Sequence, residues 1–353
     1  MLSWNETLSV PISKQISGIG LIQPSAADWD RFVCAQPRAH LLQVSAWGAL
    51  KSRFGWDERI VALGTGEEIQ AGALVLLKRL PLGLGKMAYV PMGGFATDPS
   101  YYPRLWDALE RETGASFIKL EPGQFPPGMA PDLLRMGFQE SPQTIQPPRT
   151  IVIDIASDNE TIMRRMNQGT RRKIRKSLKS GIEFKEGARA DLSAFSRLMQ
   201  QTGERNAFGV HSEAYFAQVF ELLLPTHGTL LLARHEGDLL AAIMVFALGE
   251  TAWYLYGASS RGKRNLYATY GIQWAAIQWA RKRGCRYYDL WGVPDHDEAT
   301  LETLFKERSD GLWGVYGFKR GWGGEVRRSL GAWDKARNPV VYAAYRAAIR
   351  FKG

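Results

Sequence analysis

The sequence predicts an α/β protein of two similar units, each a mixed sheet flanked by helices. The chain has 353 residues, of which 45% are hydrophobic, so two domains with cores of their own are expected. Its two halves repeat one order of expected elements: two helices, a run of strands that contains a hairpin, a loop, a helix and a last strand. Internal duplication of one unit explains this repeat most simply. Hairpins combined with crossover helices indicate mixed sheets.

The first half supplies the first copy of the unit. Short apolar or β-branched runs indicate its strands, and Gly or Pro indicates its loops, as in LPLGLGK and the stretch 122–131. A hairpin turn is expected at Glu67–Glu68. The expected elements are helices from residue 29 and over 41–56, strands over 60–63, 71–77 and 87–90, a helix over 101–113, a strand over 117–120 and a short helix over 133–136.

The two halves meet at a stretch that begins with two prolines and continues into a basic helix. Pro147–Pro148 interrupts regular structure, and the β-branched run 150–155 is typical of a strand. Ser157 and Glu160 match a capping box, which predicts one long helix from there to Gly181. Its mostly apolar face recurs at every fourth residue, at Ile162, Met166, Thr170, Ile174 and Leu178.

The second half supplies the second copy. Its expected elements are helices over 191–202 and 213–224, strands over 229–233, 239–248 and 251–257, a helix over 267–283 and a strand over 286–290. A final helix is capped by Asn338, with Pro339 at its first position. We therefore expect domains over 1–147 and 148–324, with 325–353 returning to pack on the first domain.

The charge of the chain indicates an anionic partner. The net charge is +10 at pH 7, and the isoelectric point is about 9.6. Between residues 161 and 181 there are eight Lys or Arg and no acid, and 319–352 is a second basic segment. Nucleic acid, an acidic membrane surface or a polyphosphate substrate suits such a distribution, and a merely solvated basic surface is the alternative.

Cysteine content and hydropathy bear on the compartment. Cys34 and Cys285 are the only cysteines, which fits a reducing environment. The N-terminal residues do not resemble a signal peptide, and the longest apolar run, 239–248, is too short to span a bilayer. We expect a cytoplasmic monomer that contacts the inner face of the cell membrane peripherally.

Motifs for a nucleophile, a P-loop or a metal site are absent from the sequence. The five histidines are scattered, and Asp295–Asp297 (D-H-D) stands alone in a loop, so we expect neither metal nor cofactor. The segment SSRGKRNLYATYG, 259–271, stands where an acyl-CoA N-acyltransferase would carry a glycine-rich loop, but it lacks those glycines.

The segment WGVYGFKRGWGGEVRR, 313–328, is the most informative for chemistry. Phe318 and Lys319 stand there among recurring glycines, which let the backbone approach a ligand. A lysine held by aromatic neighbours is suited to stabilise a developing oxyanion. A surface lysine in a glycine-rich hairpin is the alternative.

The order of elements resembles the acyl-CoA N-acyltransferase (GNAT) unit, used twice. Several segments also resemble the Fem-type peptidoglycan-bridge aminoacyltransferases, the FemABX family. The specific matches are QPPRT with TRRKIRK, within 146–182, and FKRGWGGE, 318–325. Weaker matches are LLQVSAWGALKSRFGW (41–56), KMAYVPMGG (86–94), TGER (202–205), WYLYGASS (253–260) and YDLWGV (288–293).

The resemblance implies two GNAT-like domains, in agreement with the duplicated order. Some family members carry a long helical hairpin in the second domain, and 186–213 leaves no room for one, so this chain resembles the short form. The family moves an amino acid from aminoacyl-tRNA onto a stem-peptide amine of a peptidoglycan precursor, either UDP-MurNAc-peptide or lipid II. The amine attacks an activated ester directly, so the enzyme needs no nucleophile of its own.

The resemblance also assigns roles to residues. Lys319 would stabilise the oxyanion, with Phe318 as its packing partner. Lys51 would hold the diphosphate end of the precursor, and Tyr89, Arg205 and Tyr256 would line the substrate site. Tyr254 and Tyr270 compete with Tyr256 for that role, and Met92–Gly94 departs from the Arg-Gly-Pro common in the family, which puts the phosphate contacts of that loop in doubt. The expected tRNA or phosphate contacts are Arg171, Arg172, Lys173, Arg175 and Lys176.

Two other functions remain open at this stage. An acyl-CoA-dependent N-acyltransferase would share the fold. A non-enzymatic RNA-binding protein would share the charge.

Overall fold

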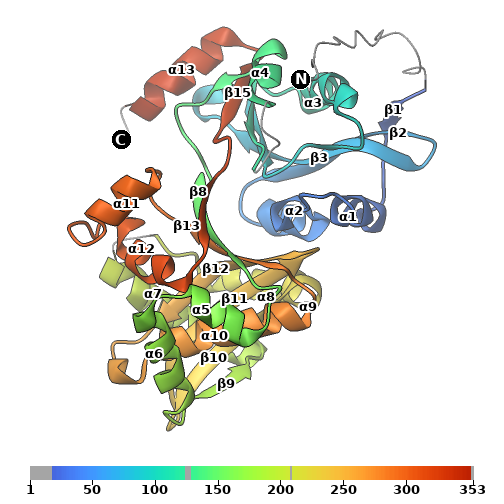
Figure 1. Ribbon diagram of the computed structural model, residues 1–353. Coiled ribbons are helices and arrows are strands. Elements are labelled where there is room, and N and C mark those ends of the chain that lie inside the picture. Colours follow the sequence, from blue (N-terminus) through green and yellow to red (C-terminus); the bar gives the residue numbers. More distant parts are fainter. Residues whose placement is uncertain (1–17, 124–128, 207–208, 351–353) are drawn as a thin grey trace, which may run out of the picture.

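A computed structural model describes residues 18–123, 129–206 and 209–350. Two mixed β-sheets form the frame, one in each half of the molecule (Figure 1). The first sheet has the order β1-β2-β3-β4-β6-β15-β7, and β5 pairs with β3 outside this path. Its strands are β1 (Gly20–Ile22), β2 (Asp57–Thr65), β3 (Glu68–Arg79), β4 (Lys86–Pro91), β5 (Phe95–Ala96), β6 (Phe117–Glu121), β7 (Gln139–Glu140) and β15 (Trp333–Ala336).

The second sheet has the order β14-β8-β13-β12-β11-β10-β9. Its strands are β8 (Arg149–Asp154), β9 (Glu183–Glu186), β10 (Gly228–His235), β11 (Asp238–Leu248), β12 (Thr251–Ser259), β13 (Tyr287–Gly292) and β14 (Glu325–Arg328). The pairing of β10, β11, β12 and β13 is antiparallel, antiparallel and parallel, and β2, β3, β4 and β6 repeat that pattern. The duplicated mixed α/β unit expected from the sequence is therefore confirmed.

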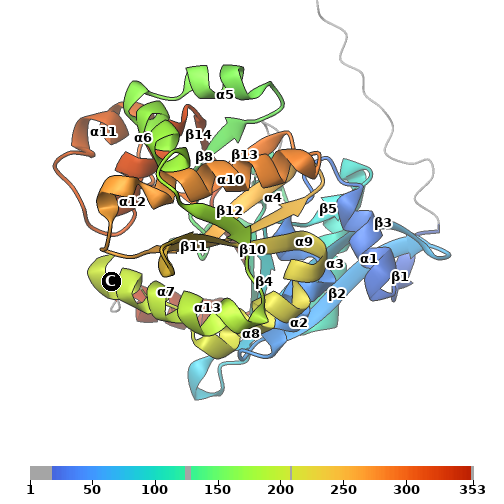
Figure 2. The ribbon, with the colours of Figure 1, turned by 90° about the horizontal axis from the view of Figure 1, so that it is seen from below.

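Helices cover both faces of each sheet (Figures 1 and 2). The helices of the first half are α1 (Ala26–Cys34), α2 (Ser45–Ser52), α3 (Tyr102–Thr113) and α4 (Met129–Arg135). Those that follow are α5 (Asn159–Arg165), α6 (Gln168–Leu178), α7 (Leu192–Asn206), α8 (Glu213–Leu222), α9 (Leu224–His227), α10 (Ala268–Lys282), α11 (Glu298–Leu304), α12 (Trp313–Lys319) and α13 (Pro339–Arg350). None of the described helices combines the length and hydropathy that crossing a bilayer requires.

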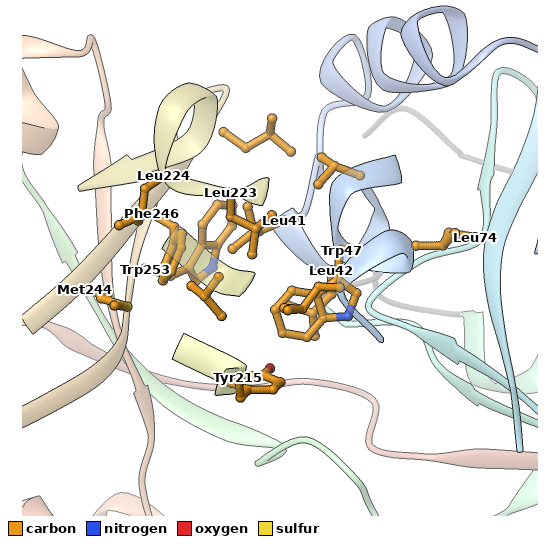
Figure 3. Close-up of a cluster of buried hydrophobic side chains, with 14 of the residues drawn as sticks. Leu41, Leu42, Trp47, Leu74, Tyr215, Leu223, Leu224, Met244, Phe246 and Trp253 are labelled. Atoms are coloured by element: carbon orange, nitrogen blue, oxygen red, sulfur yellow. The ribbon is translucent and has the colours of Figure 1, made fainter. Parts of the chain in front are cut away.

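One hydrophobic core is shared between the two halves. Leu41, Leu42 and Trp47, at and before α2, face Phe246 and Trp253 of the second sheet, as Figure 3 shows. Two further cores lie on the outer faces of the sheets, one under α3 and one under α6 and α10. Because the shared core joins the two halves, apolar burial holds them in a fixed arrangement.

The two sheets also exchange strands. The chain leaves the first half after β7, and β8 pairs with β13 and β14 in the second sheet. It later returns, and β15 inserts between β6 and β7 in the first sheet. The division of the chain into domains stays a prediction, and strand pairing puts β14 with the second sheet and β15 with the first.

Two side chains of β6 hold these crossings. Lys119 is buried, and its Nζ lies 2.9 Å from Oδ1 of Asp334 on β15 and donates to the carbonyl of Gln143 at 3.0 Å. The carboxylate of Glu121 accepts from the backbone amide of Gln146 at 3.1 Å and from the hydroxyl of Tyr89. The outgoing and returning segments are thus anchored on one strand.

The single basic helix expected up to Gly181 is wrong, because the chain breaks it into α5 and α6. Met166 is extended, and Asn167 caps α6 by accepting from the amide of Thr170 at 2.7 Å. The N-cap of α5 is Asp158, which accepts from Thr161 at 2.9 Å, and not Ser157. An Asn that satisfies a free amide three residues later starts a new helix, and the four-residue periodicity conceals this break.

The helix expected over 41–56 is shorter than predicted. Residues Leu41–Gln43 form a 3₁₀ turn, Val44 is extended, and α2 ends at Ser52. The buried amide of Gln43 donates to the carbonyls of Leu74 and Pro91, at 3.2 and 2.7 Å. These bonds to β3 and β4 hold the backbone at Gln43 away from the helical path.

We predict that Lys119→Met lowers the free energy of unfolding by about 3–5 kcal/mol, because it leaves the Asp334 carboxylate buried without its cation. Chemical denaturation measures this change. Arg31→Met removes one partner of a largely exposed ion pair with Asp28, so it serves as the control and should leave the midpoint unchanged. Equal midpoints for Lys119→Met and the wild type would contradict the anchoring role.

Candidate active site

Lys319 ends α12 with its side chain turned toward the end of β13. The residue is 6% exposed, and its Nζ donates to the carbonyl of Gly292 at 2.7 Å and to that of Trp291 at 3.3 Å. Trp291 has a φ of +62°, a left-handed conformation that is strained for a bulky residue. This turn at the end of β13 brings both carbonyls to the lysine. A strained backbone of this kind is typical of functional sites.

The carboxylate of Asp289 stabilises the strained turn at Trp291 by accepting a hydrogen bond from its backbone amide. The residue is 7% exposed, and its Oδ1 accepts from the amide of Trp291 at 2.7 Å and from the hydroxyl of Thr150. Burial raises the pKa of Asp289 to about 6, against the opposing effects of these bonds and of Lys319. Burial lowers the pKa of Lys319 to about 8, and the charge of Asp289 opposes that shift. The site therefore holds an acid and a cation whose pKa values both lie near neutrality.

Each sheet contains a pair of parallel neighbours, β4 with β6 in the first and β12 with β13 in the second. In the second sheet the two strands stop pairing before they end, and in the first they do not. In the first, β4 and β6 stay paired from Met87–Phe117 to Pro91–Glu121. In the second, the pairing of β12 with β13 ends at Trp253–Asp289, before the Trp291 turn. The two copies of the unit therefore differ at this point, and the buried lysine lies beside the open pair.

Aromatic rings surround Phe318 on the outer side of this site. The ring of Tyr270 lies 5.1 Å from Phe318, and that of Trp322 lies 5.8 Å away. Tyr270 also stacks on Trp322 and accepts a hydrogen bond from Nζ of Lys173 at 3.1 Å. Phe318 is thus fixed by packing, and α6 joins the cluster through Lys173.

The expected residues Lys51 and Tyr256 come together through a third side chain, Tyr215. Nζ of Lys51 lies 3.5 Å from the hydroxyl of Tyr215, which lies 3.1 Å from that of Tyr256. The ring of His211 stacks on Tyr215 at 3.8 Å. Burial lowers the pKa of Lys51 to about 8, with a smaller contribution from Lys78. This cluster, Lys51–Tyr215–Tyr256, joins α2 to α8 and β12.

The other two expected site residues have partners within the fold. Arg205, at the end of α7, donates to the carbonyl of Ser259 at 2.9 Å, three residues along β12 from Tyr256. Tyr89 is buried and bonded to Glu121 and Gln146, in the anchor of the outgoing crossing. Their roles toward a substrate stay predictions.

The basic residues of α6 divide into two groups. Arg171 donates to the carbonyl of Met166 at 2.6 Å and so caps α5, and Lys173 lies against Tyr270. The side chains of Arg172, Arg175 and Lys176 are exposed. Among the five residues expected to contact tRNA or phosphate, these three have exposed side chains, and Nζ of Lys176 lies 5.3 Å from the centre of the Tyr267 ring. Within the described ranges, no three His, Cys, Asp or Glu side chains cluster as a metal site would need.

Tyr215 and Asp289 were missed from the sequence. Asp289 lies in the matched segment YDLWGV, at the end of a buried strand, and an acid in that place is a usable signal. Tyr215 sits on an ordinary amphipathic helix, and nothing in its local sequence distinguishes it from a core residue.

Two GNAT-type units in one chain define the class of the protein, the tandem GNAT fold. A tandem GNAT protein of clavulanic acid biosynthesis superposes with a TM-score of 0.53 and 12% identity, covering 91% of this chain and 99% of that one. The crystal structure of FemX is more similar, with a TM-score of 0.81 and 22% identity over 92% of this chain and 99% of that one. At these identities the likeness concerns the fold alone.

The sequence profile of the FemAB family matches residues 25–122, 135–236 and 229–350, so the chain belongs to that family. A lipid II:glycine glycyltransferase of Staphylococcus saprophyticus is 26% identical, covering 89% of this chain and 92% of that protein. The enzyme of the same name from Staphylococcus haemolyticus is 27% identical over the same shares. The expectation that the chain is an enzyme of the transferase class is confirmed.

We predict that two lysines titrate near pH 8, Lys319 and Lys51, whereas exposed lysines titrate near about 10.4. NMR of the ¹³Cε resonances measures this. Asp289→Asn should lower the pKa of Lys319 further, because the carboxylate charge favours the ammonium, and should leave Lys51 unchanged. Lys319→Met should remove one of the two low transitions.

The linked effect on stability has a definite sign. Because the folded pKa of Lys319 is below that of the unfolded chain, the unfolded state binds more protons between about pH 8 and 10.4. The contribution of this group to stability therefore rises with pH across that window. A Lys319 resonance that titrates with the exposed lysines would contradict both expectations.

Proposed function

We propose that the protein transfers an amino acid from aminoacyl-tRNA to a stem-peptide amine of a peptidoglycan precursor, by direct aminolysis. The observation that carries this proposal is the buried ammonium of Lys319 beside the opened strand pair of a FemAB-family chain. The lipid II:glycine glycyltransferases to which the chain is similar support the precursor as acceptor. The precursor is either UDP-MurNAc-peptide or lipid II.

The chemistry needs a cation and no enzyme nucleophile. The acceptor amine attacks the ester carbonyl carbon, a C–N bond forms, and the carbonyl oxygen becomes an oxyanion. The intermediate then collapses, the bond to the ribose oxygen breaks, and a proton lost by the amine ends on that oxygen. An ammonium with two donors committed to Trp291 and Gly292 keeps a third for the oxyanion. Phe318, fixed by its neighbours, limits the movement of Lys319.

We assign the diphosphate of the precursor to Lys51. Its ammonium lies between the two halves, with Trp47 and Tyr215 rings 5.0 and 5.3 Å away, so a bound phosphate would meet a preoriented cation. Tyr256, bonded to Tyr215, and Arg205 at the same end of β12 would complete the contacts. Tyr89 would not contact the diphosphate itself. It would position the site indirectly, through its bonds to Glu121 and Gln146 at the outgoing crossing.

The tRNA is assigned to the exposed face of α6. Arg172, Arg175 and Lys176 have side chains in solvent on one short helix, and α6 reaches Phe318 through Lys173 and Tyr270. A polyanion lying along this helix would therefore lead toward Lys319.

Two alternatives are less well supported. A coenzyme A-dependent acyltransferase would be favoured by a glycine-rich loop before α10, and the chain has Arg261–Arg264, RGKR, there instead. An RNA-binding protein without activity would not require a strained turn that presents two carbonyls to a buried lysine.

Peripheral contact with the inner membrane face is assigned to α13. Its Tyr342 packs on Phe117 with ring centroids 5.3 Å apart, whereas Val340 is 79% exposed. An apolar residue presented beside basic ones suits an anionic lipid surface. Absence of flotation with anionic vesicles would remove this assignment.

We predict that Lys319→Met lowers turnover about 10²–10³-fold, as loss of one oxyanion donor does, while tRNA affinity is retained. The assay follows radiolabelled Ala, Ser or Gly from tRNA to the precursor, with acetyl-CoA as the competing donor. Lys306→Met, an exposed lysine before α12, is the matched control and should be fully active. Transfer from acetyl-CoA alone would favour the acyltransferase, and tRNA binding with no product from the wild type would favour the RNA-binding protein.

We predict that replacing both Arg172 and Arg175 with Gln weakens tRNA binding and lowers the slope of log Kd against log salt by roughly one to two, because each released phosphate contact removes about 0.7–0.9. Filter binding over a salt series measures it. The control replaces two exposed arginines of the first half, Arg31 and Arg111, for the same change in net charge. Equal slopes for both double variants would contradict the assignment.

A further inference from the structure

A cavity of about 220 Å³ lies between the two halves, next to the Trp291 turn. The segment Pro37–His40 lines it from the first half, and β8, β12, β13 and β14 line it from the second. Its charged side chains are Arg38, Asp289 and Arg327. Trp253 and Tyr287 supply aromatic wall. The cavity is partly open to solvent, and its volume suits the end of an amino-acid side chain rather than a nucleotide.

Asp289 is the anionic group of this cavity. Its Oδ1 accepts two hydrogen bonds, from Thr150 and from the Trp291 amide, whereas Oδ2 accepts none from the described residues. A carboxylate that is 7% exposed has little contact with water, so a donor, preferably a cation, that met Oδ2 from the cavity would stabilise its charge. The nearby Lys319 donates to the carbonyls of Trp291 and Gly292, and not to this oxygen.

The two arginines make the rest of the cavity cationic. Arg327 is close enough to Asp289 to lower its pKa, yet it is bonded to Glu325, at 2.9 Å, and not to Asp289. A guanidinium has five donors, so this exposed bond leaves donors for a ligand. Arg38 lies on the opposite wall and is hydrogen-bonded to Tyr102, so only its remaining donors can meet a ligand. His40 is neutral here, because burial lowers its pKa to about 3, so it adds no charge.

An anion and two cations around one small space match a ligand that carries both an ammonium and a carboxylate. The ammonium of the ligand would donate to Oδ2 of Asp289, and the carboxylate of the ligand would pair with Arg327 and Arg38. Trp291 and Gly292 line the same cavity and accept from Lys319, so an amine held here would stand next to the oxyanion-stabilising group.

We propose that this cavity binds the reacting end of the acceptor, and that this end is an amine with a carboxylate on the same carbon. Such an end belongs to a diamino acid of the diaminopimelate type, and the lysine ε-amine lacks the carboxylate. The proposal rests on the function proposed above and adds its acceptor specificity. Asp289 binds the ammonium and takes one of its protons, so that the free amine can attack the ester and the proton can pass to the departing ribose oxygen, and Arg327 selects the carboxylate.

The test uses two precursors that differ only in the diamino acid, diaminopimelate or lysine. The wild type should show a kcat/KM at least about tenfold higher for the diaminopimelate form, the effect of one charged hydrogen-bonded pair. Arg327→Gln should bring the ratio of the two values close to one. Arg328→Gln is the matched control, because Arg328 pairs with Asp295 at 2.8 Å and does not line the cavity, so it should keep the wild-type ratio. Asp289→Asn should lower kcat/KM for both acceptors at least about tenfold, since both present an ammonium.

Several results would overturn the proposal. One is equal use of both acceptors by the wild type, and another is an unchanged ratio in Arg327→Gln. An Asp289→Asn enzyme with a raised KM for aminoacyl-tRNA alone would assign the cavity to the donor ammonium instead. If no tRNA donates to either acceptor, the proposed function fails, and the cavity is then judged by ligand-observed NMR with free diaminopimelate and with Nα-acetyl-lysine amide, which presents only the ε-amine. Binding of diaminopimelate that is lost in Arg327→Gln would uphold the site, and no preference over Nα-acetyl-lysine amide would reject it.

Discussion

The arrangement of the two halves depends on strand exchange that is anchored on β6. Lys119 and Glu121, two residues apart on that strand, hold the returning and outgoing segments through Asp334 and Gln146. Because these polar contacts are buried, they fix where each segment runs. Replacing them with apolar side chains could preserve stability, but it would lose the positional information that paired charges provide.

The site is assembled from elements on both sides of these crossings. Thr150, which bonds Asp289, lies on β8 just after the outgoing crossing, and Arg327 lies on β14 just before the return. Lys51 belongs to the first half, and its partner Tyr215 to the second. The surroundings of Asp289 and the Lys51–Tyr215 contact therefore both depend on how the two halves are placed relative to each other. A shift of one half against the other would disturb both.

Burial is the common cause of the site's electrostatics. It lowers the pKa of Lys319 and raises that of Asp289, and the attraction between the two opposes both shifts. The result is a lysine that remains a cation near neutral pH but holds its proton less firmly than an exposed one. Such a donor gives its hydrogen bond more readily to a developing negative charge.

Much of the fold could be predicted from the sequence, because β-branched runs and turn residues determine strands locally. The duplicated order of strands and the paired hairpins followed from such patterns. The break at Asn167 could not be predicted, because a helix cap and a helix interior share the same apolar spacing. The pairing of β8 in the second sheet and of β15 in the first could not be predicted either, because pairing between residues far apart in the sequence leaves no local signal.

The candidate site was predicted in part. Lys319 and Phe318 were proposed because glycines and aromatic residues mark their segment and the segment resembles the family, and Lys51 and Tyr256 because they lie in matched segments. The contact of the last two through Tyr215 depends on how α8 packs, which the sequence does not encode locally.

The most direct test of the central claim is mass spectrometry of muropeptides from the source organism with and without the gene for this protein. The proposed function predicts that stem peptides lose the mass of one or more amino-acid residues on the diamino acid when the gene is absent, and regain it when the gene is restored. Identical muropeptide masses in both strains would contradict the account.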